Sequence, residues 1–176
     1  GVDVSGQFRF RAQDKNETAG ANKGTNSNGT DVEVEVGVKV PVTDNVTAVF
    51  KIDNANDDTD SVTKGNVTIE DYYFSYANGP LTVNYGQQNI PGRITDGAQG
   101  DGVVALYNLG AVTVGAAAFM TNSLTSGDDV YSVIAMGNVG PVSLLAQYAD
   151  IPDASEIYNV KADASVSMLK VGVEYT

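Results

Sequence analysis

The stretch VDVSGQFRFRAQDKN, residues 2–16, decides the fold because its side chains alternate in character almost without a break. From Val2 to Gln13, apolar residues or glycine hold the even positions, and polar or charged residues hold the odd positions. One set is Val4, Phe8 and Phe10, and the other is Ser5, Gln7, Arg9 and Arg11. Alternation with a period of two residues predicts a β-strand that has one apolar face and one polar face.

The same alternation recurs along the chain in segments of about ten residues, each bounded by Gly, Asn, Asp or Pro. No long run carries apolar residues at the spacing of an amphipathic helix. We therefore predict an all-β fold of about eleven strands. They are 2–13, 31–40, 45–54, 66–76, 81–88, 102–108, 111–121, 130–136, 142–149, 156–164 and 169–176.

The predicted strand 31–40 shows what the polar face carries. Its valines lie on one face, and the other face presents Glu33, Glu35 and Lys39. If this strand pairs with the first one, the two glutamates can balance Arg9 and Arg11 across the pair.

The connections between the predicted strands alternate between long and short. Long segments such as 12–31 and 53–65 alternate with tight turns such as 42–45 and 77–80. Long loops at one end and short turns at the other are typical of transmembrane β-barrels. A β-sandwich in solution also alternates along its strands, so a secreted or surface-layer β-sandwich with a structural or adhesive role stays open as an alternative.

Composition excludes several classes of function. The formal net charge is −12, from 22 acidic and 10 basic residues, and such a chain would repel the phosphates of nucleic acids. The chain has no His and no Cys, so it lacks a His-based triad and thiol or imidazole metal ligands. We expect no enzymatic activity. The acidic balance is compatible with a pore that favours cations.

The segment DNANDDTD, residues 53–60, is dense in the side-chain oxygens that calcium prefers. An EF-hand loop needs Gly at its sixth position and Glu at its twelfth. Counted from Asp53, those positions hold Asp58 and Lys64. We interpret the segment as a solvated acidic loop.

Three stretches resemble the major outer membrane porins of Campylobacter-type bacteria. They are VDVSGQFRFRAQDKN at 2–16, TDNVTAVFKIDNAN at 43–56 and EDYYFSYANGPLTVNYGQQNIPGRITDGAQGDG at 70–102. Within the last stretch, Gly86-Gln-Gln88 followed by Ile94-Thr-Asp96 is similar to the start and body of that family's third loop. The resemblance implies a porin-like antiparallel transmembrane β-barrel in the bacterial outer membrane.

This resemblance also implies a function and a site. The protein would be a general diffusion porin and homotrimer in outer membrane lipid, passing small hydrophilic solutes and ions. Its third loop, at 89–101, would fold inward as the constriction, and calcium at Asp96 and Asp101 would be its one cofactor. The implied pore-lining and constriction residues are Arg9, Arg11, Glu33, Glu35, Lys39, Arg93, Asp96 and Asp101.

Porins of this kind have about 16–18 strands, whereas residues 1–176 supply about ten or eleven. We therefore predict a single β-barrel domain, or the N-terminal portion of one that continues beyond this chain. If residues 150–167 formed one long loop, the chain would instead be a closed ten-stranded barrel. Such a small barrel could sit in the outer membrane without conducting.

Overall fold

The structure is a computed structural model, and it describes residues 1–16, 26–54, 67–95, 97–125, 127–152, 155–166 and 169–176. Its regular elements are eleven β-strands. They are β1 (Asp3–Asn16), β2 (Asn26–Pro41), β3 (Val46–Asp53), β4 (Thr68–Asn78), β5 (Leu81–Asn89), β6 (Gln99–Asn108), β7 (Val112–Asn122), β8 (Val130–Val139), β9 (Val142–Ile151), β10 (Ser155–Val166) and β11 (Leu169–Tyr175). Within these ranges, no helix has the length and hydropathy needed to cross a membrane.

The strand prediction is confirmed for all eleven segments, with differences at the ends. β2 begins at Asn26, before the predicted position 31, and β6 begins at Gln99, before the predicted position 102. The alternative of one long loop over residues 150–167 is wrong, because β10 occupies most of that segment.

All eleven strands belong to one sheet, and each lies beside its neighbours in sequence, from β1 to β11. A β-sandwich needs two sheets packed face to face, so this topology does not support the sandwich alternative. Several connections are tight hairpins. Gly79 and Gly140 have φ values of 55° and 60°, and each precedes a proline in a two-residue turn. Positive φ at the first turn residue suits glycine in a type II′ turn.

The chain forms two compact units, which are described separately. The first comprises Gly1–Val40 and Val49–Glu70, and the second comprises Pro41–Ala48 and Asp71–Thr176. In the first unit β1 and β2 are antiparallel, with Phe8 opposite Val34 and Arg9 opposite Glu33. This register places apolar residues on one face and charged residues on the other, as the alternation predicts. The apolar face is exposed and is not covered at Phe8, which is 72% exposed.

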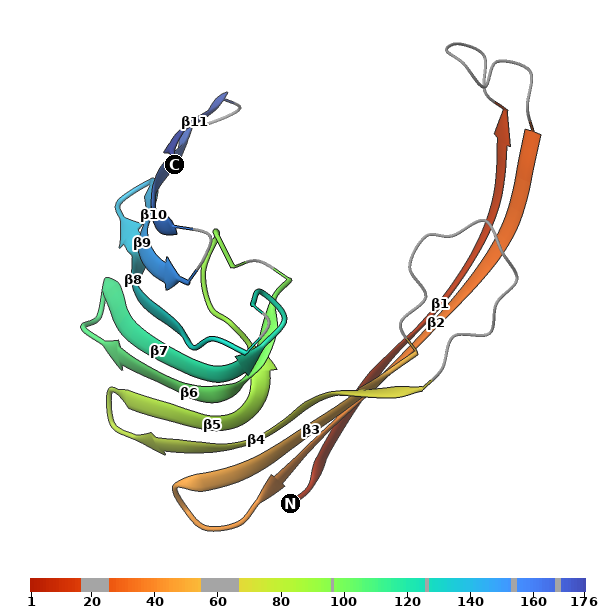
Figure 1. The fold of residues 1–176 in the computed structure, drawn as a ribbon, viewed down its shortest axis with the longest axis horizontal. Coiled ribbons are helices and arrows are strands. Elements are labelled where there is room, and N and C mark those ends of the chain that lie inside the picture. The colour runs from red at the N-terminus through yellow and green to blue at the C-terminus, as the bar shows by residue number, and fades with distance from the viewer. Residues whose placement is uncertain (17–25, 55–66, 96, 126, 153–154, 167–168) are drawn as a thin grey trace. The chain divides into compact units, whose positions relative to one another are not determined.

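In the second unit, strands β5, β6 and β7 are visibly curved (Figure 1). The registers place one set of aromatic and aliphatic side chains on a single face of β4–β11. Members of this exposed apolar face include Tyr72, Phe74, Tyr85, Tyr107, Val133, Tyr131, Tyr158, Val160, Val173 and Tyr175. We call this surface the outer face, and the opposite surface of the same strands the inner face.

The core of the second unit lies on the inner face, beneath the segment that joins β5 to β6. This segment, residues 90–98, contributes buried Ile90 and Ala98. The strands contribute the other members of the cluster, which are Val104, Ala117, Phe119, Val130, Ala149 and Ile151. The segment is therefore packed against the sheet by apolar contacts.

Candidate functional site

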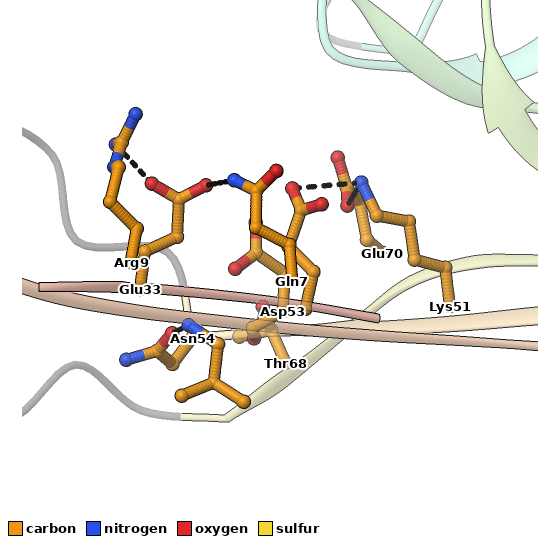
Figure 2. A network of polar contacts seen from close by, with 10 residues as sticks. Gln7, Arg9, Glu33, Lys51, Asp53, Asn54, Thr68 and Glu70 are labelled. Atoms are coloured by element: carbon orange, nitrogen blue, oxygen red, sulfur yellow. Dashed lines mark hydrogen bonds and ion pairs between the residues drawn. The ribbon is translucent and has the colours of Figure 1, made fainter. Parts of the chain in front are cut away.

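The charged face of the first unit carries a network of polar side chains that cross the strands (Figure 2). Arg9 of β1 forms an ion pair with Glu33 of β2. Gln7 of β1 donates a hydrogen bond from Nε2 to the other oxygen of the same carboxylate, at 3.1 Å. Glu33 therefore links two residues of the opening strand, and the predicted balance between the arginines and the glutamates is realised for Arg9.

Lys51 of β3 extends this network toward β4. Its ammonium lies 3.2 Å from Glu35 Oε1 and 2.6 Å from Glu70 Oε2. All three side chains are about one quarter exposed, so the pairs lie in a partly desolvated layer on the face of the strands. An ammonium shared by two carboxylates fixes three neighbouring strands by charge-assisted hydrogen bonds.

Glu35, Asp53 and Glu70 form the one group of three carboxylates in the described residues whose oxygens converge within 4.8 Å. Such a group could hold a metal ion in principle. Here the Lys51 ammonium bonds two of the three carboxylates and supplies the positive charge. The cluster is therefore an ion-pair network in which Lys51 takes the place that a metal ion could occupy.

In the second unit the segment 90–98 is tied to β9 through Gln147. The Gln147 Oε1 accepts a hydrogen bond from the Ile94 backbone N–H, at 2.9 Å. The Gln147 Nε2 donates to the Thr95 hydroxyl, at 3.1 Å, and to the Ser132 hydroxyl, at 3.2 Å. Polar and apolar contacts together hold the segment against the inner face.

Arg93 projects from the same segment and forms an ion pair with Glu174 of β11, with Nε and Oε1 3.3 Å apart. Asn159 of β10 donates to the same carboxylate oxygen, at 2.9 Å. Arg93 also lines a surface recess together with Lys161 and Asp163, which form their own ion pair at 3.2 Å. The inner face near the segment is therefore charged on β10 and β11.

The structure brings some of the predicted site residues together. Five of them lie in the first unit at register positions that share one face, and these are Arg9, Arg11, Glu33, Glu35 and Lys39. Arg93 lies in the segment between β5 and β6, as expected. Asp96 lies outside the described residues.

Asp101 is placed differently from its predicted position in the loop. It is a residue of β6, opposite Gln87 of β5, and the Tyr72 hydroxyl hydrogen-bonds to its carboxylate. Tyr72 belongs to the exposed outer face. The loop as observed ends at Ala98, before β6 begins at Gln99, so Asp101 does not lie with the buried residues of the segment.

Sequence reasoning missed the residues that hold the segment 90–98 in place. A signal was present in the strands beneath it, where apolar residues occupy consecutive positions and so lie on both faces of the strand. The runs are VVALY at 103–107, AAAFM at 116–120 and VIAM at 133–136. Continuous apolar runs are typical of strands that are covered on both faces. Gln147 itself carries no such signal, because a polar residue on the inner face is expected by alternation.

An antiparallel sheet with an exposed apolar outer face, a charged face and a segment packed on its inner side defines a porin-like transmembrane β-barrel protein. The family model of the Campylobacter major outer membrane protein matches residues 1–175, and the chain belongs to this family. A comparison with curated proteins found no match. Membership places the protein in the bacterial outer membrane and implies an outer membrane porin, a class that in general is not enzymatic.

Proposed function

We propose that the protein lets small hydrophilic solutes and ions diffuse passively across the outer membrane. One observation carries the proposal. The strands expose aromatic and aliphatic side chains on one face, and in the first unit they present a cross-strand network of charges on the other. Lipid suits the first face, and a water-filled lumen suits the second.

The segment 90–98 is the constriction in this proposal. It is not a loop extended into solvent, because Ile90, Thr95 and Ala98 are each at most 5% exposed. A segment packed on the lumen side of the strands reduces the cross-section that a solute can use. Solutes would therefore be selected by size at the segment and by charge along the polar face.

A preference for cations follows from the net charge of −12, because a pore with an acidic balance raises the local concentration of cations. The ion pairs of the first unit offset part of this charge, since Arg9 and Lys51 each neutralise a glutamate. We therefore propose a moderate preference, which weakens at high ionic strength.

The homotrimer and the calcium site rest on the resemblance. Of the two expected calcium ligands, Asp96 lies outside the described residues, and the Asp101 carboxylate on β6 accepts a hydrogen bond from the Tyr72 hydroxyl of β4. A shift in conductance on addition of a calcium chelator, lost in the Asp96→Asn variant, would support calcium at the constriction.

Reconstitution in planar lipid bilayers tests the function. We expect stepwise conductance increases and, in a salt gradient, a reversal potential of the sign for cation selectivity. Deletion of residues 91–97 should raise the conductance of each step. A membrane-inserted protein that gives no steps would overturn the proposal and favour a non-conducting barrel. Steps with unchanged size after the deletion would mean that this segment does not narrow the pore.

A further inference from the structure

Gln147 is a buried polar side chain whose partners lie on another part of the chain. It is 4% exposed, and both the oxygen and the nitrogen of its side-chain amide form hydrogen bonds. The oxygen accepts from the Ile94 N–H, while the nitrogen lies within reach of the Thr95 hydroxyl and, at 3.4 Å, of the Pro91 carbonyl. A buried amide with these partners is costly to remove, because each partner would lose its hydrogen bond inside the protein.

Apart from Gln147, the polar contact in the described residues that ties the segment to the sheet is the ion pair between Arg93 and Glu174, and the segment's other hydrogen bonds shape it from within. The Thr95 hydroxyl reaches the Ile90 and Pro91 carbonyls, each at 3.1 Å, and the Ala98 N–H donates to the Thr95 carbonyl at 3.0 Å. These bonds close the segment on itself as a compact loop. Gln147 connects this closed loop to β9, and through Ser132 to β8.

The backbone of the loop at Gly92 lies close against the Gln147 amide. Gly92 has a φ of 132°, and a Cβ at this position would overlap the Gln147 amide. The close approach therefore requires glycine at position 92, and the loop can move away from the sheet only if the amide contacts break.

We propose that Gln147 is the positioning residue that holds the segment 90–98 on the inner face, and so sets the width of the constriction. The inference rests on the proposed function for its consequence in transport. Its structural part, that Gln147 fixes the loop, can be tested without any measurement of conductance.

Trypsin provides that test, because the N–H that Gln147 binds belongs to the Arg93–Ile94 peptide bond, a site for trypsin. Cleavage requires the loop to open, and its rate follows the population of the open form when closing is fast. In the native protein extracted from outer membranes, Gln147→Ala should raise the rate of cleavage after Arg93 by roughly tenfold or more. Gln147→Glu keeps an acceptor oxygen but buries a carboxylate beside the Pro91 carbonyl, so it should give an increase at least as large.

Gln88→Ala is the matched control. Gln88 is 5% exposed on β5, and its amide donates to the Gly86 carbonyl of the same strand. This variant should be cleaved after Arg93 at the wild-type rate. Thr95→Val, which removes the hydroxyl that Gln147 contacts, supplies a second variant in case Gln147→Ala does not assemble, and it should also speed cleavage.

The same variants in planar bilayers link the loop to transport. Gln147→Ala should enlarge the conductance step toward that of the 91–97 deletion, while Gln88→Ala should leave it unchanged. Wild-type rates of cleavage in both Gln147→Ala and Thr95→Val would overturn the inference. If the wild-type protein forms no channel, the proposed function fails, and the cleavage rates still decide whether Gln147 holds the loop.

Discussion

Gly92 lies directly against the side chain of Gln147, so that the loop backbone and the buried amide occupy adjoining space with no room for a Cβ between them. The pair joins the loop after β5 to a strand far along the chain.

We expect Gly92→Ala to displace the loop and to destabilise the second unit. The alanine would meet the Gln147 amide and would also have to adopt a φ of 132°, a conformation that costs about 1–3 kcal/mol for a residue with a Cβ. The temperature at which the folded band is lost on a detergent gel should fall. Gly97→Ala is the control, because Gly97 also has a positive φ, 76°, but a Cβ there meets no atom within 4 Å. Equal losses for the two variants would show that strain, and not the Gln147 contact, is responsible.

Lys51→Met should destabilise the first unit by about 1–3 kcal/mol, because two partly buried carboxylates lose the ammonium that bonds them. Thermal unfolding followed on detergent gels measures the effect. Lys39→Met serves as the control, since Lys39 is exposed on the same face of β2. A loss as large for Lys39→Met as for Lys51→Met would contradict the role given to the network.

Reversing the charges of Arg9 and Arg11 to Glu should raise cation selectivity, measured as the reversal potential in a salt gradient. The variant adds negative charge to the polar face and removes the ion pair between Arg9 and Glu33. The change should shrink at high salt, because the Debye length falls from about 10 Å at 0.1 M to about 3 Å at 1 M. Reversal potentials equal to those of the wild type would remove both arginines from the pore wall.

Val160→Lys should destabilise the protein in the membrane, by about 2–4 kcal/mol if the residue lies near the bilayer midplane. Val160 is 54% exposed on the outer face of β10, where a charge would meet lipid. The next residue, Lys161, lies on the opposite face and pairs with Asp163. Lys161→Val should therefore reduce stability much less. Similar losses of stability for both variants would contradict the assignment of one face to lipid and the other to water.

The sequence predicts the strands well because period-two alternation and turn residues are local signals. The pairing of Arg9 with Glu33 could also be predicted. Consecutive strands joined by a loop pair antiparallel, and the charged residues of both strands alternate onto the same face. The sequence alone places Asp101 in the loop, because nothing local separates loop from strand in the glycine-rich stretch 97–102.

The anchoring of the loop could not be predicted from local pattern. Gln147 and Ile94 are separated by 53 positions, so their contact depends on the curvature of the strands between them. The network around Lys51 was missed for a related reason. Glu70 stands far from Glu35 in sequence, and only the placement of β4 beside β3 brings their carboxylates to one ammonium.

The contact between the loop and β9 has a consequence for the order in which the protein folds. Every strand lies beside its sequence neighbour, so the sheet can grow by successive hairpins, each closing a short stretch of chain. In this order the partner of the loop after β5 lies on β9, four strands further along the chain. The contact between Gln147 and the loop can therefore form only once both β5 and β9 have been paired into the sheet, whichever end of the sheet forms first.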